Sequence, residues 1–436
     1  MQSSREKWLS SERKFTSQRS KQRHTAANDT FRKRPFPTKL RCLFCHGTLS
    51  KDSPLAVPSQ IAVVGSTGSI GTSCLDVVRA HPDKLQVVGL SIWQNTAQLE
   101  KQVREFGPQW CVIGSPDAAV PAALAGKVQL SLGNDALLQL VTRSNIDTVV
   151  SAMVGAAGLP VTLAAVEAGK RVAIANKESL VVAGSLITRR AAETGAAVFP
   201  VDSEHSAVFQ CLQPGDRGAV RRIVLTASGG PFRGWTRAQQ QQVTPEMALQ
   251  HPTWEMGPKI TVDSATMMNK ALEIIEARWL FGLQADQISV MIHPQSVIHS
   301  FVEFVDGAVI AQHSPPDMRL PIQYALLYPE RHPGPAAQTN WLESQTLQLL
   351  PPDLEAFPAL QLGFEAARQG GTCGAVLNAA NEVAVKRFLN SQLSFICITR
   401  LVQEVLNHHT YDAQPDLQQL LTADQWAREE AARWKP

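Results

Sequence analysis

Two acidic residues, Asp202 and Glu204, stand two positions apart at the end of a short apolar run at 198–201. Side chains alternate in direction along a strand, so this spacing at a strand end predicts that both carboxylates point to the same side. Two hard oxygen ligands on one face suit Mg²⁺ or Mn²⁺ better than zinc. The competing interpretation is a solvated pair of acids in a turn. The spacing therefore predicts a candidate cation site that still needs ligands.

A second group of polar residues lies where a helix is predicted to begin. Ser264, Asn269 and Lys270 supply a hydroxyl, an amide and a cation next to a strongly helical segment at 271–281. Unpaired backbone N–H groups at a helix start attract anions, and a lysine adds charge-assisted hydrogen bonds. These residues therefore predict a phosphate-binding site.

Glu273 follows Lys270 by three residues, which places both side chains on one face of the predicted helix. Taken alone, the two residues are also compatible with a surface ion pair. A buried, unpaired Glu273 would be energetically costly, whereas one that binds a cation beside Asp202 and Glu204 would not. Glu273 is therefore the candidate third ligand.

The segment 228–259 lies between these groups and has the features of a closing lid. It carries a hydroxyl at Ser228 in a glycine turn, a further glycine at Gly234 and an aromatic tip at 251–257. Long segments of this kind often close over a bound substrate. For Trp254 in the tip, the alternative is an ordinary position in the core.

The elements that must position these residues begin with the apolar run 61–64, the glycine turn 65–71 and a helical pattern after it. This order predicts a buried parallel strand, a phosphate-binding turn and a helix, which together form a dinucleotide-binding fingerprint. The glycine spacing is GxxGxxG rather than GxGxxG, and a tight turn in an ordinary α/β domain is the alternative.

Cofactor choice depends on the residues after the second predicted strand, at 86–90. Residues 91–95 contain no acid that could bind a ribose 2′-hydroxyl, which disfavours NAD. They contain no Lys or Arg either, so NADP is favoured only by elimination.

Further strands are predicted at 110–113, 148–153 and 171–175, with a helix at 159–168. Alternating strands and helices predict an α/β chain with a Rossmann-like, doubly wound sheet through about residue 190. A central α+β catalytic domain and a C-terminal helical bundle should follow. In the bundle, apolar residues at helical spacing predict helices at 359–369, 374–390, 394–407 and 416–434.

Composition sets the broad class of the protein. The 436 residues suffice for two or three domains, and 44% hydrophobic and 18% charged residues are typical of a soluble globular protein. No run of 18 apolar residues is present, which argues against a membrane span. Seven scattered cysteines do not form a disulfide framework and favour a reducing compartment.

The first 57 residues differ from the rest of the chain. They carry 13 Lys and Arg against four Asp and Glu, whereas the remainder is mildly acidic. They lack hydrophobic periodicity, so we expect a disordered extension. Its composition fits a transit peptide, a nucleic-acid-binding arm or an unstructured leader. We interpret the C-x-x-C-H pattern at 42–46 as a coincidence, because haem attachment requires export.

Eight short motifs then establish a resemblance. In order along the chain they are GSTGSIG (65–71), ANKES (175–179), PVDSEH (200–205), SGGPF (228–232), HPTWEMG (251–257), DSATMMNKALE (263–273), EARWLF (276–281) and IHPQSVIHS (292–300). Over about residues 60–430 the chain resembles the 1-deoxy-D-xylulose 5-phosphate reductoisomerase family. The resemblance implies an enzyme that isomerises and reduces 1-deoxy-D-xylulose 5-phosphate to 2-C-methyl-D-erythritol 4-phosphate. It also implies NADPH and a divalent metal, Mg²⁺ or Mn²⁺, with Co²⁺ as a third candidate.

The resemblance carries roles onto matching residues. Metal ligands would be Asp202, Glu204 and Glu273, which with Lys270 form the expected catalytic set. Cofactor contacts would be Thr67, Gly68, Ser69, Ile70, Gln94, Asn95, Asn176, Lys177, Glu178 and Gly257. Substrate contacts would be Ser203, Glu204, Ser228, His251, Trp254, Ser264, Asn269, Lys270 and Glu273.

It also implies a domain plan. The expected parts are the extension (1–57), an NADPH-binding domain (58–190), a catalytic domain (191–330) with the lid at 228–259, a linker (331–355) and a C-terminal helical domain (356–436). The partner would be a small phosphorylated sugar, with no nucleic acid and no membrane. We expect a homodimer, to which an exposed strand at 297–312 could contribute. We also expect a bacterial cytoplasmic location, with a plastid as the alternative if the extension is a transit peptide.

One motif departs from the family pattern. Trp93-Gln94-Asn95 replaces a glycine, a basic or small residue and an asparagine, which puts the strictness of NADPH over NADH in question.

Two other functions are alternatives. Another NADP-dependent dehydrogenase would need a catalytic cysteine near a histidine, and no cysteine lies in a suitable motif. A non-enzymatic dinucleotide-binding regulator would leave the acids and the phosphate site without a role.

Overall fold

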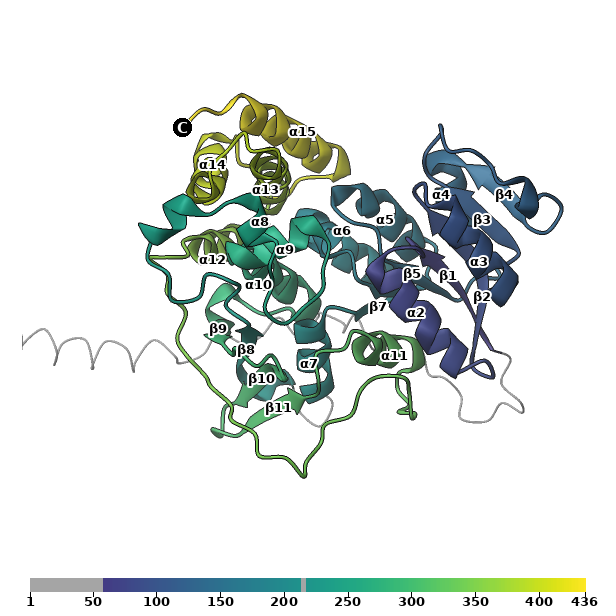
Figure 1. Ribbon diagram of the computed structural model, residues 1–436, viewed down its shortest axis with the longest axis horizontal. Coiled ribbons are helices and arrows are strands. Elements are labelled where there is room, and N and C mark those ends of the chain that lie inside the picture. Colours follow the sequence, from purple (N-terminus) through teal and green to yellow (C-terminus); the bar gives the residue numbers. More distant parts are fainter. Residues whose placement is uncertain (1–57, 213–216) are drawn as a thin grey trace, which may run out of the picture. The chain divides into compact units, whose positions relative to one another are not determined.

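The computed structural model describes residues 58–212 and 217–436 (Figure 1). The expectations for residues 1–57, including disorder and the C-x-x-C-H pattern, lie outside the described residues. Within those residues, buried apolar side chains form one continuous core.

A seven-stranded parallel sheet begins the described chain, with the strand order β4-β3-β2-β1-β5-β6-β7. The apolar run 61–64 in β1 is completely buried, as expected for a central parallel strand. The strands are β1 (Ser59–Val64), β2 (Leu85–Ile92), β3 (Trp110–Ile113), β4 (Gln129–Leu132), β5 (Thr148–Ser151), β6 (Arg171–Ile174) and β7 (Ala197–Pro200).

This sheet confirms the doubly wound fold, but it extends further than predicted. The sequence pattern ended the sheet at about residue 190, whereas β7 pairs with β6 as far as Pro200. The strand order reverses between β1 and β5, which creates the crevice where such sheets bind ligands. The connecting helices are α2 (Ser69–Ala80), α3 (Thr96–Phe106), α4 (Gly133–Thr142), α5 (Leu159–Glu167) and α6 (Lys177–Thr194).

A second, mixed sheet of four strands has the order β11-β10-β8-β9. Its strands are β8 (Val220–Ala227), β9 (Ile288–Ile292), β10 (Ile298–Phe304) and β11 (Val309–His313). The expectation of one strand at 297–312 is therefore wrong. The chain reverses at Gly307, whose φ of +89° suits glycine, so that β10 and β11 form an antiparallel hairpin.

Helices α7 (Ser203–Cys211) and α10 (Met268–Phe281) link the two sheets to the site. α7 follows β7 and packs on β10 and β11, while α10 packs on α6 and on β8 and β9. The other helices of this region are α8 (Pro245–Ala248), α9 (Pro258–Ala265) and α11 (Arg319–Leu327). Short 3₁₀ turns are η1 (Ala122–Leu124), η2 (Ala156–Gly158), η3 (Arg217–Ala219), η4 (Gln239–Gln242) and η5 (Ala285–Gln287).

The C-terminal helices agree with the predicted ones to within one residue at each end. They are α12 (Ala359–Gln369), α13 (Cys373–Leu389), α14 (Phe395–His408) and α15 (Leu417–Arg433). α13 packs against α14, α15, α12, α6 and α9, so it connects the bundle to both preceding regions (Figure 1).

Two other predictions can be compared with the described residues. The five cysteines there are buried and unpaired, and burial raises the pKa of the Cys74 thiol to about 12. Cys74, Cys211 and Cys373 are therefore packing residues. Among the described helices, none has the length and apolarity that a bilayer crossing requires.

A candidate metal and phosphate site

Asp202 and Glu204 come together at the start of a helix rather than on a strand. β7 ends at Pro200, Asp202 is the N-cap residue of α7, and Glu204 lies in the first helical turn. The strand-alternation argument was therefore wrong, although both carboxylates do lie together. Oxygen atoms of Asp202, Glu204 and Glu273 all lie within 4.8 Å of one another. We call these three residues the carboxylate cluster.

Glu273 lies on α10 and is completely buried. Its Oε2 lies 2.5 Å from Lys270 Nζ, and Lys270 Nζ also lies 2.7 Å from Glu204 Oε1. The surface ion pair considered from the sequence is thus excluded, because the lysine and Glu273 are both buried. Lys270 bridges two of the three carboxylates instead.

Lys177 is a second buried cation at the cluster. It forms an ion pair with Asp202, lies 3.5 Å from Glu273 Oε1 and donates to Asn269 Oδ1 at 2.8 Å. Asn269 in turn donates to Glu273 Oε1 at 2.6 Å. In this structure Lys177 and Asn269, expected at the cofactor and at the phosphate, both lie against the carboxylates.

The charges of the cluster are only partly balanced. Burial and the neighbouring Glu204 raise the pKa of Glu273 to about 7, although Lys270 opposes this shift. Burial also acts to raise the pKa of Asp202, but the Lys177 cation holds it well below its usual value. Burial and the neighbouring carboxylates thus outweigh the two lysines that contact Glu273, so a further positive charge would stabilise its ionised form. The donor set therefore fits a divalent cation that prefers oxygen ligands.

Two further residues were missed from the sequence. His205 Nδ1 lies 3.1 Å from Glu276 Oε2, and both side chains are buried. Burial alone would lower the pKa of His205, but the Glu276 carboxylate raises it to about 9. Both residues were within the quoted motifs, and Glu276 follows Glu273 by three residues on the same helical face, a signal that could have revealed it.

Ser228, His251 and Ser264 form a separate group, which we call the serine–histidine group. His251 Nε2 lies 3.1 Å from each serine hydroxyl. Its Nδ1 accepts hydrogen bonds from the backbone N–H groups of Thr253 and Trp254. Nε2 therefore carries the ring proton, and burial lowers the pKa of this histidine. Two hydroxyls thus converge on a neutral imidazole.

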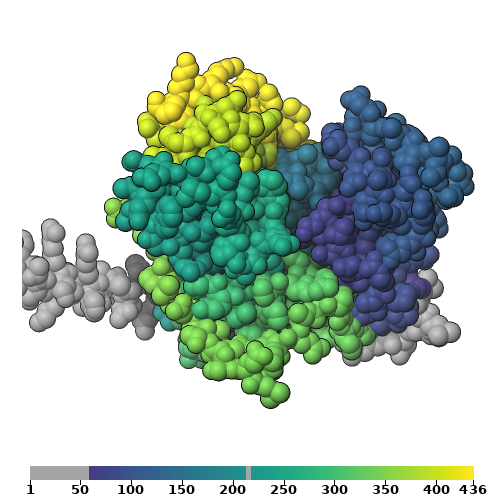
Figure 2. All heavy atoms as spheres, in the orientation of Figure 1, coloured from purple at the N-terminus to yellow at the C-terminus, as the bar shows by residue number. Residues whose placement is uncertain are grey.

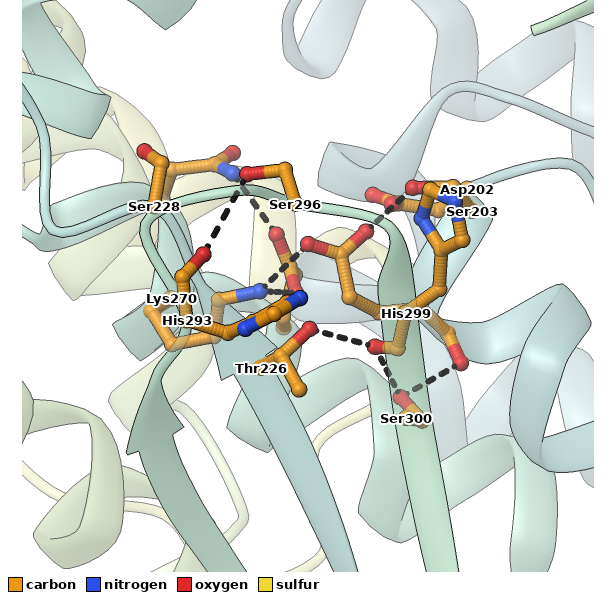
Figure 3. A network of polar contacts seen from close by, with 12 residues as sticks. Asp202, Ser203, Thr226, Ser228, Lys270, His293, Ser296, His299 and Ser300 are labelled. Carbon is orange, nitrogen blue, oxygen red and sulfur yellow. Dashed lines mark hydrogen bonds and ion pairs between the residues drawn. The ribbon is translucent and has the colours of Figure 1, made fainter. Parts of the chain in front are cut away.

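The two groups lie on either side of one polar network. In Figure 3, Ser228 and Asp202 lie on opposite sides of the network that contains Lys270. The second sheet supports this network, because Ser300 on β10 donates to the Glu204 carbonyl at 2.9 Å. His293 Nδ1 lies 2.8 Å from the Gln348 carbonyl oxygen, a contact that holds the ring in place.

A cavity of about 630 Å³ opens beside the serine–histidine group. His251, Trp254, Met256 and Thr261 are among its lining residues. Trp254 is only partly buried, and its ring lies 6.4 Å from that of His299. The aromatic tip of the predicted lid thus borders a space large enough for a small ligand.

The glycine turn fits a dinucleotide. A Cβ atom on Gly71 would lie 2.3 Å from the Gly65 carbonyl oxygen, so the helix can approach the turn this closely only with glycine. Gly68 precedes α2, and no side chain caps the first backbone N–H groups there. These groups remain available to a pyrophosphate. Thr67, Ser69 and Ile70 are partly or fully exposed on the same turn.

The other residues expected to contact the cofactor differ in how exposed their side chains are and in whether these side chains already have partners. The Asn176 side chain is buried and donates to the Met153 and Gly155 carbonyls at 2.9 Å, so it supports the backbone. Gln94 and Asn95 are exposed, and Asn95 Oδ1 caps α3 by accepting from Gln98 N. Glu178 pairs with Lys259, and Gly257 precedes α9.

Family models match most of the described chain. Residues 61–184 match the model described as 1-deoxy-D-xylulose 5-phosphate reductoisomerase. Residues 198–281 and 313–430 match two models of the C-terminal domains of the same enzyme. A curated relative from Rhodopirellula baltica, named 1-deoxy-D-xylulose 5-phosphate reductoisomerase, is 48% identical over 431 residues, which cover 86% of this chain and 94% of the relative.

Solved structures show the same similarity. The reductoisomerase from Zymomonas mobilis in complex with NADPH is 43% identical, with a TM-score of 0.81 over 86% of this chain and 98% of that one. A DOX-P reductoisomerase in complex with NADPH, fosmidomycin and magnesium is 40% identical, with a TM-score of 0.80 over 86% and 97% of the two chains.

Proposed function

This chain belongs to the 1-deoxy-D-xylulose 5-phosphate reductoisomerase family, and from that membership we propose what each part of its site does. The protein is an NADPH-dependent oxidoreductase that isomerises and reduces 1-deoxy-D-xylulose 5-phosphate to 2-C-methyl-D-erythritol 4-phosphate in isoprenoid precursor biosynthesis, with a divalent metal as cofactor. The observation that carries the residue assignments is the convergence of three carboxylates, one of them completely buried, with two buried lysines.

Asp202, Glu204 and Glu273 hold the divalent cation in this proposal. When bound, the cation supplies Lewis-acid stabilisation of the oxyanion that develops as the carbon skeleton rearranges. Lys177 keeps Asp202 ionised and ready to bind, since their ion pair lowers the pKa of that carboxyl. Lys270, between Glu204 and Glu273, offers a fixed positive charge to a substrate oxygen.

Ser228, Ser264 and His251 bind the substrate phosphate. Their neutral hydroxyl and imidazole groups donate hydrogen bonds. Asn269 and Lys270 on α10, which contact Glu273 in this structure, would reach the phosphate from the side of the carboxylate cluster. Ser203, which donates to Glu204 Oε2 at 2.6 Å, lies between the metal ligands and the substrate. Binding energy from the remote phosphate can drive closure of the lid 228–259 and exclude water from the reacting carbons.

NADPH binds along the glycine turn, where Thr67, Gly68, Ser69 and Ile70 meet the pyrophosphate at the start of α2. Asn176, Lys177 and Glu178 begin α6 at the carboxyl end of β6 and border the reacting end of the cofactor, together with Gly257. The domains at 58–190, 191–330 and 356–436, with the linker 331–355, would then divide cofactor binding, catalysis and support between them.

The selectivity for NADPH over NADH depends on residues 93–95. Gln94 and Asn95 supply amides but no cation for a 2′-phosphate. Trp93 is 60% exposed and packs against Gly114, where a Cβ atom would lie 2.8 Å from the ring. We therefore expect NADPH to be preferred over NADH by a smaller factor than in relatives with a basic residue at position 94.

Assembly and location are further parts of the proposal. We propose a homodimer, because the outer edge of β11 is unpaired among the described residues and exposes Val309 and Ile310. We also propose that the protein works in a bacterial cytoplasm with Mg²⁺ or Mn²⁺. If the protein is a dimer, light scattering should give twice the chain mass. If the extension is not needed for catalysis, removal of residues 1–57 should leave activity unchanged.

The function is tested by following NADPH oxidation with 1-deoxy-D-xylulose 5-phosphate, with and without Mn²⁺ or Mg²⁺, and again with NADH. We expect oxidation that requires metal and runs faster with NADPH. Folded protein that oxidises neither cofactor in the presence of metal and substrate would overturn the proposal.

A further inference from the structure

The segment 152–158, which we call the switch-point loop, follows β5. β5 lies beside β1 at the reversal of strand order, where dinucleotides bind in sheets of this kind. A Cβ atom on Gly65 would lie 2.6 Å from the Ala152 carbonyl oxygen, so the switch-point loop packs directly against the glycine turn. A shift of this loop would therefore change the shape of the cofactor crevice.

Two side chains hold the switch-point loop from different parts of the chain. Asn176 donates to the Met153 and Gly155 carbonyls from the start of α6. Glu382 Oε1, on α13, accepts a hydrogen bond from the Ala156 backbone N–H at 3.0 Å. The C-terminal helices thus reach the cofactor crevice from 226 residues away in the sequence. Figure 2 shows a hollow between the yellow C-terminal helices and the blue first sheet.

Glu382 is itself fixed in place. Its Oε2 lies 2.8 Å from Arg428 Nη2 on α15, and its Oε1 accepts from Asn378 at 3.0 Å. Asp424 holds the same guanidinium at 2.6 Å. Burial acts to raise the pKa of Glu382, but Arg428 and Lys259 lower it, so the group stays ionised at neutral pH. An ionised acceptor makes a stronger hydrogen bond to a backbone N–H than a neutral one.

The neighbouring residue on α13 contacts α9. Asn381 donates to Asp263 Oδ1 at 2.8 Å, and Asp263 Oδ2 lies 2.8 Å from Lys259. Lys259 also pairs with Glu178 at 3.2 Å. Both Lys259 and Asp263 lie on α9, which begins directly after Gly257 at the end of the lid. Two consecutive residues of α13 therefore contact α9 and the switch-point loop.

We propose that Glu382, held by Arg428, is a positioning residue for NADPH: by accepting the Ala156 N–H it keeps the switch-point loop in the conformation that receives the dinucleotide. The inference rests on the proposed function, because that function supplies the ligand. It gives the C-terminal helices a role in cofactor binding without any contact to the cofactor. The Asn-Glu pair at 381–382, which had no assigned chemistry in the sequence, becomes part of the site.

The test is NADPH binding to the full chain, measured by calorimetry without substrate. Glu382→Ala removes the acceptor and leaves Arg428 with Asp424 as its partner. We expect NADPH to bind roughly tenfold more weakly or worse, as for loss of a charge-assisted hydrogen bond. The KM for NADPH should rise by a similar factor, while the KM for 1-deoxy-D-xylulose 5-phosphate stays within about twofold. A merely structural residue would change both KM values and the melting temperature together.

Two further variants complete the experiment. Glu382→Gln keeps an oxygen for the Ala156 N–H but loses the ion pair, so it should weaken NADPH binding by a smaller factor and carries the test if the alanine variant does not fold. Asp424→Asn, the matched control, disturbs the same arginine without touching the loop and should bind NADPH within about twofold of the unaltered chain.

The outcomes separate the two proposals. Folded Glu382 variants that bind NADPH within twofold of the unaltered chain would overturn the positioning role alone. Equal losses in both KM values would overturn it as well, because they indicate general destabilisation. An unaltered chain that binds no NADPH would instead contradict the proposed function.

Discussion

The carboxylate cluster and the serine–histidine group lie in one polar network but are held in different ways. The cluster joins the starts of α6, α7 and α10 within the continuous core, and two buried lysines already balance part of its charge. The serine–histidine group is neutral, and His251 comes from the segment between α8 and α9. In the proposed function, the charged group in the core performs the chemistry and the neutral group recognises the phosphate.

Glu204→Gln tests the charged side of this comparison and should have the largest effect. The change keeps the shape of the side chain but removes one of three charges that hold the cation. We expect kcat to fall by roughly 100-fold or more, since metal Lewis acidity contributes several kcal/mol. NADPH binding by calorimetry should remain within twofold. Glu429→Gln, an exposed acid on α15, is the control, and normal turnover in Glu204→Gln would refute the ligand assignment.

Lys270→Ala should have the next largest effect. It removes the cation that bridges Glu204 and Glu273, and with it a charge-assisted contact of about 1.5–3 kcal/mol. We expect kcat/KM to fall by about tenfold to a hundredfold. Steady-state kinetics would measure this loss, and a change below about twofold would remove Lys270 from the catalytic set.

His251→Asn tests the neutral side. The variant loses the imidazole that bridges Ser228 and Ser264. Each of these two contacts is a neutral hydrogen bond, which contributes about 0.5–1.5 kcal/mol. We expect the KM for the sugar phosphate to rise by up to about tenfold, with little change in metal affinity measured by titration. Loss of metal affinity in this variant would show that the two groups are not independent.

Acid pH should weaken the neutral side through protonation of His251. Burial lowers the pKa of His251 from its usual value of 6.5, so the imidazole is neutral at pH 7 and above. As pH falls through the lowered pKa, Nδ1 gains a proton and can no longer accept from Thr253 and Trp254. The stability that the neutral ring contributes is present above pH 6.5 and lost below it.

We therefore expect the KM of the unaltered chain to rise a few-fold more steeply below pH 6.5 than that of His251→Asn. The variant is the control for ionisation of the substrate phosphate itself. Identical pH profiles for the two proteins would show that His251 does not titrate in this range.

From the sequence, the residues of the site were identified more accurately than the elements on which they lie. It identified Asp202, Glu204 and Glu273 as a possible set, but it attributed the first two to a strand, whereas Asp202 caps α7. The error has a physical cause, because the strand ends two residues earlier and the helix start turns both carboxylates inward. Likewise the run at 297–312 was read as one strand, since apolar alternation continues across the turn at Gly307.

The partners of Lys177 and Glu382 could not have been predicted. Lys177 begins a helix and belongs to a motif expected at the cofactor, yet it contacts Asn269 and Glu273, which lie 92 and 96 residues further on. Glu382 lies in an alanine-rich helix, and only the packing of α13 on α6 and α9 brings it to Ala156. Neither contact has a local signal.

The doubly wound sheet, the glycine turn and the C-terminal helices could be predicted from the amino-acid order, because apolar periodicity and glycine placement act over a few neighbouring residues. The folded chain alone shows which polar groups meet: the buried lysines and the carboxylates, the histidine and two serines, and the glutamate and the switch-point loop. Those contacts join residues far apart in the chain, and their energies depend on burial, which only the packed fold supplies.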